Sequence, residues 1–491
     1  MGARRDHWWA GFGGNIVAAT LPGARRTAVG SAAQAARPQA LKADFDSLRV
    51  SLFLLTVLTV SRVHQHFPFI AKLHPALILA ALTALYAYLN PRLLVTGGLF
   101  QSWIPKLVAA IGVWACFSVP FGISLGGAAK FFLDEYSKTL IYFVLLVVAI
   151  RGPRDLYTLI WAYVISSGIL VYLSWFVFHV RRYSINGLER ISTGYTYDAN
   201  DLGLVLIIGL ALAILTYQTS GKYGKMASAL VVLGVGATIA RSGSRGAFVG
   251  LVVVGAALLF MLKSVSVTAR LGFLLATVIA LGIAAPVGYW KQMGTILRPS
   301  DDYNSTTVNG RVAVAKRGMG YMFSYPIFGL GLNNFARAEC FISDKAQNHV
   351  VGTGLRCTPP HNSFVQAAAE LGIPGLIMFS SLVFGSIIAM NRLRRRLPPA
   401  WATGDPEQRF MYLASMYLAL AMIGFAVTAF FPTFAWLDMV YFIAAMMGGL
   451  YVCVERRLRE TAPARGAAVA VARAPRRRGA PVTPRFITPP Q

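Results

Sequence analysis

Residues 361–375 read HNSFVQAAAELGIPG, and they open a long apolar segment that runs to about Met390. The segment ends in the basic run NRLRRR at 391–396. An apolar stretch long enough to cross a bilayer and closed by arginines is typical of a membrane-spanning helix whose basic end lies in the cytoplasm. His361 is therefore expected at the opposite, outer surface of the membrane, next to a long polar loop.

The composition of the whole chain indicates a polytopic membrane protein. Of its 491 residues, 56% are hydrophobic and 13% are charged, whereas a soluble protein carries roughly a quarter charged residues. The formal net charge is +27, but the arginines gather at both termini and in short loops, which is the positive-inside pattern. We therefore expect contact with membrane lipid and no nucleic-acid partner. The basic stretches 1–48 and 455–491 are expected to be disordered cytoplasmic tails.

Apolar segments of about 20 residues predict an all-α protein with about twelve transmembrane helices. If the N-terminus is inside, the loops assigned to the cytoplasm are basic, and both termini lie in the cytoplasm. The basic outer loop with Arg181, Arg182 and Arg190 runs against this rule. Helices 1–9 are expected within 49–289, one large periplasmic loop over 290–360, and helices 10–12 within 361–454. The expected spans are 49–68, 74–90, 104–123, 138–151, 156–179, 201–218, 226–241, 245–263, 270–289, 363–390, 409–430 and 434–454.

The segment 290–360 is long for a connection, and loops of this length are usually functional or disordered. Within it, Arg311–Phe323 mixes basic and apolar residues, as a helix on a membrane surface does. Cys340 and Cys357 share the loop, and a bacterial periplasm is an oxidising compartment. We therefore expect a disulfide between these two cysteines. No metal-binding spacing of His and Cys occurs in the sequence, so no metal or other cofactor is expected.

Candidate site residues gather at the predicted outer face. Arg241 and Arg245 flank the tight turn between the seventh and eighth spans, and arginine suits a phosphate because its planar group donates paired hydrogen bonds. Arg311 is expected near the start of the surface helix, with Arg317 behind it. His361 begins a helix, whose positive end favours the neutral imidazole that a general base needs. The competing interpretation is that the arginines only contact lipid headgroups and that His361 is an interfacial residue.

The histidine motif also resembles a known family. His361-Asn362, followed after nine residues by the GIPG of 372–375, resembles the signature of the O-antigen ligase superfamily of bacterial envelope glycosyltransferases. The turn Ser244-Arg245-Gly246 is similar to that family's first outer arginine motif. Arg311 through Phe335 resembles the start of its long periplasmic loop.

The resemblance extends from about Thr193 to the last span, and the first five spans match in topology only. Asp198-Ala199-Asn200 resembles a weaker element of the family. Ala315 departs from the loop motif, which has leucine at this position, and this leaves the role of Arg311 less well supported than that of His361.

The resemblance implies an inner-membrane transferase that moves glycan from undecaprenyl pyrophosphate to an acceptor, with inversion and without a metal or a nucleotide sugar. The acceptor is lipid A core, a growing glycan or a protein. On this interpretation Arg245, Arg311 and Arg241 neutralise the leaving pyrophosphate. His361 orients or deprotonates the acceptor hydroxyl. Asn362 and Arg317 are expected to bind substrate.

Two alternatives remain open at this point. An O-antigen or exopolysaccharide polymerase shares the same signature, so the sequence does not separate it from a ligase. A transporter or lipid flippase also suits about twelve spans, although such proteins typically have related halves and charged residues at the bilayer midplane. No repeat is evident, and Glu370 and Asp438 are the only acids well inside the expected spans.

Overall fold

The protein is described here by a computed structural model. The described residues are 41, 46–95, 101–183, 188–192, 197–261, 266–286, 288–298, 300, 302, 307–347 and 357–473. The expected N-terminal tail up to residue 40 and the chain after Arg473 lie outside these residues.

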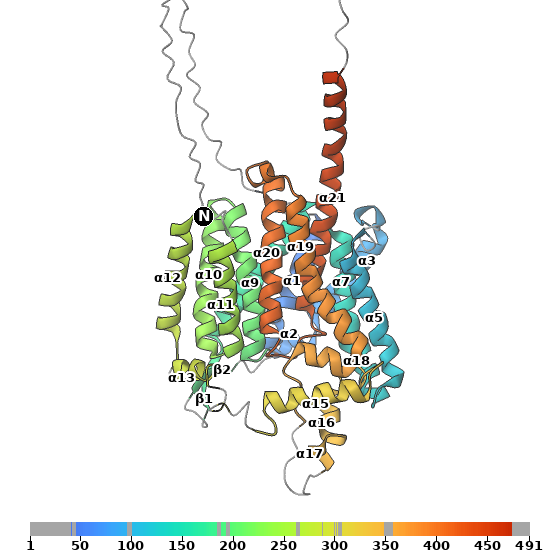
Figure 1. Ribbon diagram of the computed structural model, residues 1–491, viewed down its shortest axis with the longest axis vertical. Coiled ribbons are helices and arrows are strands. Elements are labelled where there is room, and N and C mark those ends of the chain that lie inside the picture. The colour runs from blue at the N-terminus through green and yellow to red at the C-terminus, as the bar shows by residue number, and fades with distance from the viewer. Residues whose placement is uncertain are drawn as a thin grey trace, which may run out of the picture. The chain divides into compact units, whose positions relative to one another are not determined.

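The described part of the chain is almost entirely helical, which confirms the all-α class (Figure 1). The longer helices are α1 (Ser47–Ser61), α3 (Pro75–Leu89), α5 (Trp103–Phe121), α7 (Ser137–Ala149), α8 (Pro153–Phe176), α9 (Ala199–Thr219), α10 (Lys222–Ser242), α11 (Arg245–Met261), α12 (Val267–Ala284), α15 (Arg311–Ser324), α18 (Ser363–Ser380), α19 (Ser386–Arg396), α20 (Pro406–Thr428) and α21 (Asp438–Arg473). The shorter helices are α2 (Pro68–Lys72), α6 (Leu125–Phe131), α13 (Tyr289–Gly294), α16 (Phe335–Phe341) and α17 (Asp344–Gln347). An antiparallel hairpin of β1 (His179–Tyr183) and β2 (Leu188–Ser192) pairs Arg181 with Arg190.

Several helices begin at residues that satisfy the free N–H groups of a first turn. Ser102, Asp198 and Asp405 each accept such a hydrogen bond, at the starts of α5, α9 and α20. A side-chain oxygen at this position stabilises a helix by about 1 kcal/mol. The sequence therefore sets these helix starts locally, before any packing is considered.

The described residues include eight helices that are long and apolar enough to cross a membrane, and three shorter apolar helices. The shorter ones are α1, α3 and most of α11, which coincide with expected spans. The expected span 138–151 corresponds to α7, which continues from α6 through a π-helical turn at Phe132–Tyr136. The chain is thus a polytopic membrane protein.

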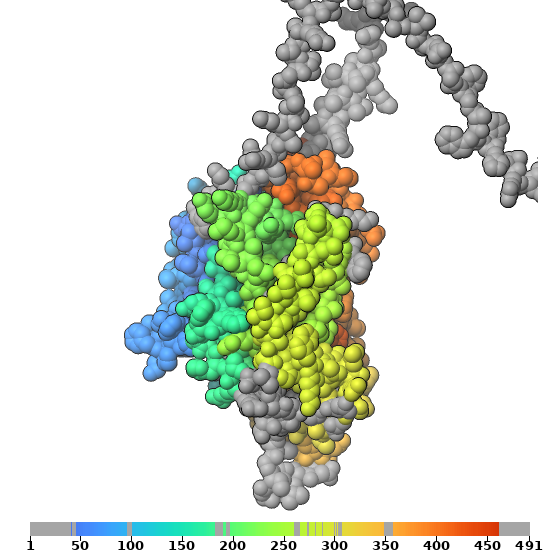
Figure 2. All heavy atoms as spheres, turned by 90° about the vertical axis from the view of Figure 1, so that its left-hand side faces the viewer, coloured from blue at the N-terminus to red at the C-terminus, as the bar shows by residue number. Residues whose placement is uncertain are grey.

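Helices differ in how much of their surface other helices cover. In α9 and α20, 83% of an apolar 18-residue stretch of the helix is buried inside the protein, compared with 6% in α12. A helix that is apolar all round and buried lies at the centre of a bundle, so α9 and α20 are central. Helix α12 packs on α10 at the periphery, where it lies on the surface in the view of Figure 2.

The two ends of the helical bundle carry different structures. At one end, ion pairs join neighbouring helices, among them Arg154–Glu407 between α8 and α20 and Arg396–Glu455 between α19 and α21. At the opposite end lie α15, α16 and α17 (Figure 1). These helices belong to the expected loop 290–360, which is therefore partly helical.

Several predicted boundaries differ in the structure. The first span was expected to reach 68, but α1 ends at Ser61 and α2 is a separate helix. The ninth span was expected to reach 289, but α12 ends at Ala284 and a separate helix, α13, follows. The last helix was expected to end at 454, but α21 continues to Arg473, so the first part of the expected tail is helical. An ion pair between Arg457 and Glu460, three residues apart, supports this extension.

Candidate active site

Arg245 lies at the first position of α11, in a turn that α9 holds from behind. The Ser244 hydroxyl donates to the Asn200 side-chain oxygen (2.9 Å) and accepts from the Ala247 N–H (3.2 Å). Ser244 and Asn200 are both buried. Asn200 belongs to the weak motif 198–200, and the structure gives that motif a physical role, because it fixes the start of α11.

The Arg245 guanidinium contacts two residues from the segment after α13. Its Nη1 donates to Thr295 Oγ1 (2.7 Å) and to Asp302 Oδ2 (2.6 Å). The side chains of Arg245 and Asp302 are 11% and 12% exposed. A mostly buried guanidinium that binds one carboxylate oxygen has the chemistry to bind a phosphate oxygen in its place.

Phe431, in the loop between α20 and α21, joins the two arginine motifs. A side chain at Gly246 would meet its ring, since an added Cβ would lie 2.5 Å from Phe431 Cγ. The Arg311 guanidinium carbon lies 5.6 Å from the centre of the same ring, a cation–π contact. Arg311 begins α15. The turn of Arg245 and the start of the surface helix therefore meet at one aromatic side chain.

The same loop holds His361. We name residues 429–437 the α20–α21 loop. The His361 N–H donates to the Thr433 hydroxyl (3.1 Å), and the Ser363 N–H donates to the Ala429 carbonyl (2.8 Å). His361 itself has a φ of 47°, in the left-handed region, which few residues other than glycine occupy. A backbone held in this conformation by its surroundings is common at functional sites.

Asn362 caps α18. Its side-chain oxygen accepts the N–H groups of Phe364 (2.9 Å) and Val365 (3.1 Å). This is the standard role of asparagine before a helix. Asn362 was expected to bind substrate, and the structure shows its oxygen engaged with the helix.

Helix α18 is broken at Gly372, the first residue of the GIPG stretch at 372–375. Gly372 has a φ of 69°, which residues with a side chain rarely adopt. Pro374 has no N–H, so the carbonyl of Glu370 lacks its helical partner. The Gly331 N–H donates to that carbonyl instead (3.0 Å). The glycine-rich turn after α15 thus packs directly on the break in α18.

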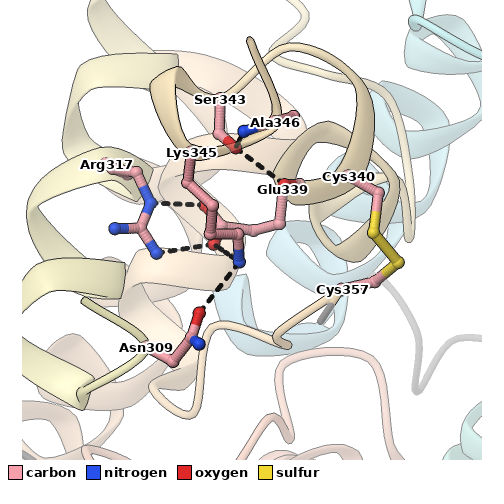
Figure 3. The surroundings of a disulfide bond; sticks show 8 residues. All are labelled: Asn309, Arg317, Glu339, Cys340, Ser343, Lys345, Ala346 and Cys357. Carbon is pink, nitrogen blue, oxygen red and sulfur yellow. Dashed lines mark hydrogen bonds and ion pairs between the residues drawn. A yellow bond between two sulfur atoms is a disulfide. The ribbon is translucent and has the colours of Figure 1, made fainter. Parts of the chain in front are cut away.

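Arg317 is bound within the loop itself (Figure 3). Its Nε and Nη2 donate to the two oxygens of Glu339 (2.8 and 2.6 Å), and Lys345 Nζ donates to Glu339 Oε2 (3.1 Å). Burial opposes ionisation of Glu339, but the hydrogen bonds from Arg317 and Lys345 outweigh it and lower the pKa of this carboxyl below its ordinary value. Arg317 was expected to bind substrate, and the structure places it in an internal ion pair.

Cys340 and Cys357, the pair expected from the sequence, form a disulfide with a Cα–Cα distance of 5.1 Å. Cys340 follows Glu339 in α16, and Cys357 lies four residues before His361. Figure 3 shows the bond beside the Arg317–Glu339 pair. The bond therefore ties the segment that leads to His361 to the folded part of the loop.

Arg241 is separate from these residues. Its Nε donates to the Ser174 carbonyl (3.2 Å), and its guanidinium lies 4.9 Å from the Trp175 ring centre. Both partners belong to α8. The structure thus brings Arg245, Arg311 and His361 to one loop and directs Arg241 to another helix.

Sequence reasoning missed Asp302, Thr433 and Phe431. The sequence carries no spacing that links Phe431 to Arg245 or Arg311, because the three lie in separate segments. Asp302 is an acidic residue of the expected periplasmic loop 290–360. A search for carboxylates able to pair with Arg245 could have singled it out.

Comparison with known proteins agrees with this geometry. Residues 229–380 match the family described as O-antigen ligase. This stretch of the chain is therefore similar to the O-antigen ligase family, as the sequence motifs suggested. The matched region contains Arg245, Arg311 and His361, whereas Phe431 and Thr433 lie beyond it. The match supports, in general terms, an enzyme of the ligase and polymerase type that acts on lipid-linked glycan and an acceptor. No curated protein matches the chain.

Proposed function

We propose that this protein is an O-antigen ligase-like enzyme that transfers a glycan from undecaprenyl pyrophosphate to an acceptor, lipid A core or a similar glycan, with inversion and without a metal. The single observation that carries the proposal is the α20–α21 loop. Phe431 contacts both arginine motifs, and Thr433 in the same loop binds the backbone of His361.

The arginines serve the leaving group. In the transfer, the acceptor oxygen forms a bond to the anomeric carbon while the bond from that carbon to the phosphate oxygen breaks. Negative charge then develops on the departing lipid pyrophosphate. Arg245 and Arg311 stabilise this charge, and the Asp302 carboxylate leaves Arg245 when the donor binds.

His361 receives the proton of the acceptor hydroxyl. It precedes α18, whose N-terminal end carries a partial positive charge. This charge disfavours an imidazolium and keeps the ring neutral before the reaction. Asn362 and Arg317 act indirectly, since one caps α18 and the other holds Glu339.

The reaction is assigned to the periplasmic face of the bacterial inner membrane. The end of the bundle opposite to α15–α17 carries Arg154 and Arg394–Arg396, as expected of a cytoplasmic side. The Cys340–Cys357 disulfide suits an oxidising compartment. With this orientation both termini are cytoplasmic.

A transfer assay tests the proposal. Purified protein is mixed with a lipid-pyrophosphate glycan donor and lipid A core in the presence of a chelator. Wild-type protein is expected to transfer glycan, and His361→Ala is expected to lose transfer while inserting normally in the membrane. Arg154→Ala, which removes an arginine at the opposite end of the bundle, is the matched control. Full activity in His361→Ala would overturn the assignment.

The same assay separates ligase from polymerase. A ligase joins glycan to lipid A core and leaves the carrier free. A polymerase instead lengthens the glycan that remains on the carrier. Transfer only to carrier-linked glycan would replace the ligase proposal with the polymerase.

A further inference from the structure

Glu370 is a buried carboxylate in α18 that the proposed chemistry does not use, with 1% of its surface exposed. Its Oε2 accepts from Trp436 Nε1 (2.6 Å) and from the Asn333 N–H (2.9 Å). Its Oε1 accepts from the Phe335 N–H (3.3 Å), and the Gln366 amide lies 3.5 Å from Oε2. One carboxylate therefore receives hydrogen bonds from three separate parts of the chain.

The donors belong to the two segments that carry the proposed site. Asn333 lies in the turn after α15, the helix that begins with Arg311, and Phe335 begins α16 directly after that turn. Trp436 lies in the α20–α21 loop, whose Thr433 binds the backbone of His361. Glu370 is thus bonded on one side to the segment of Arg311 and on the other to the loop of His361.

Gln366, one helical turn before Glu370, makes a second link to the same loop. Its side-chain oxygen accepts from the Ala435 N–H (3.0 Å), which directs its amide group toward Glu370. Both residues are buried. The first two turns of α18 therefore bind the α20–α21 loop through two side chains.

Every polar partner of the Glu370 side chain in these contacts is a donor. Two of them are backbone N–H groups and one is an indole N–H, and these three cannot turn to offer an acceptor. The fourth is the Gln366 amide, whose oxygen is already bound by the Ala435 N–H. A carboxylate matches this set, because an ionised carboxyl group only accepts. A glutamine of the same size would direct an amide N–H at one of these donors, and a buried mismatch of this kind is unfavourable.

We infer that Glu370 is a positioning residue that holds the segment of Arg311 and the loop of His361 in a fixed mutual arrangement without touching substrate. This inference rests on the proposed function for its effect on catalysis. The structural part of it, the joint fixation of two segments, does not depend on that function.

The kinetic test uses Glu370→Gln. Arg245 is fixed independently of Glu370, through Ser244 and Asn200, so binding of the lipid-pyrophosphate donor is expected to survive. We expect kcat to fall about 10- to 100-fold, since a misplacement of about 1 Å has effects of this size. The KM for the donor is expected to stay within about threefold of wild type. A kcat equal to that of wild type would overturn the inference.

A second measurement separates positioning from a general loss of stability. Thr216→Val removes a buried hydrogen bond to Ser228 in the α9–α10 pair, away from the Glu370 contacts, and serves as the matched control. Hydrogen exchange is followed in residues 325–335 and in the α20–α21 loop. In Glu370→Gln both segments are expected to exchange faster together, while Thr216→Val leaves them protected. Unchanged protection of both segments in Glu370→Gln would overturn the inference.

Trp436→Phe provides an independent variant if Glu370→Gln does not accumulate in the membrane. It keeps an aromatic ring and removes the indole N–H that binds Glu370 Oε2. It is expected to lower kcat by a smaller factor with the donor KM retained, and an unchanged kcat would overturn the inference. If wild-type protein transfers no glycan at all, the proposed function fails. The hydrogen-exchange result then still decides whether Glu370 fixes the two segments.

Discussion

Arg245 and Arg317 each form an ion pair with a carboxylate, in two different surroundings. Each guanidinium binds a carboxylate oxygen at 2.6 Å, and the two arginine side chains are 11% and 17% exposed. The carboxylates differ. Asp302 keeps 12% of its side chain exposed, whereas Glu339 is fully buried and also binds Lys345.

This difference separates an exchangeable ion pair from a structural one. A buried carboxylate with several donors is costly to remove, because its partners would then be left without an acceptor. A carboxylate that keeps part of its side chain exposed is less costly to displace, so another anion, such as a phosphate, can take its place on the arginine. The difference in burial of the two carboxylates therefore supports substrate binding at Arg245 and loop stability at Arg317. The following variants test these two roles.

The largest effect is expected from Arg245→Ala. Loss of a group that stabilises charge in the transition state typically lowers kcat by about 10²–10³-fold. Thermal unfolding in detergent should change little relative to Arg317→Ala, because Arg245 is partnered by a more exposed carboxylate. Transfer rates and melting temperatures of the two variants give the comparison. If Arg317→Ala lost transfer at unchanged stability, the roles assigned to the two arginines would be reversed.

A smaller effect, on stability, is expected from Glu339→Gln. The neutral amide weakens the contacts to Arg317 and Lys345, and we expect a loss of about 2 kcal/mol at neutral pH. The measurement is hydrogen exchange of residues 311–347 against wild type. Protection equal to wild type would show that the ion pair does not stabilise the loop.

The same carboxyl group predicts a pH dependence. Its pKa in the folded protein lies below the ordinary value of 4.5, so its contribution is fully present above 4.5 and is lost as the pH falls through the lowered pKa. Wild-type protein should lose loop protection on acidification below about 4.5, and Glu339→Gln should lose less. Parallel curves for the two proteins would contradict this assignment.

The smallest effect is expected from Asp302→Asn. Removing the carboxylate that competes for Arg245 should lower the KM for the lipid-pyrophosphate donor by up to about tenfold, or about 1.4 kcal/mol. A higher KM would mean that Asp302 holds Arg245 in place for the donor. Glu407→Gln, which weakens the ion pair with Arg154 at the opposite end of the bundle, is the control.

Much of the fold could be predicted because a membrane-spanning helix can be recognised from a continuous run of apolar residues in the sequence. The start of α18 at Ser363 agrees with the tenth expected span, which begins at residue 363. The end of α12 at Ala284 was not predicted, because the expected span ran on to residue 289. Pro286 and Gly288 between α12 and α13 are the local signal that could have placed it. Apolar content fixes that a segment is helical but defines its end poorly.

The candidate site was predicted in part. Arg245 and His361 stood out because charged or titratable residues at an outer membrane face are costly and rarely accidental. Arg317 and Asn362 were selected as polar residues near Arg311 and His361. In the structure, Arg317 binds Glu339, and Asn362 binds the first turn of α18. Residue type and sequence position do not reveal which partner a polar group finds after folding.

By itself, the sequence determined that the chain is a helical membrane protein, and it located the segments of Arg245, Arg311 and His361. Both properties depend on local composition and short spacing, which the chain carries in any conformation. Only the tertiary structure decided that Phe431 joins the two arginine motifs and that Glu370 binds two distant segments. Contacts of this kind form between residues far apart in the chain, and they depend on how the helices pack.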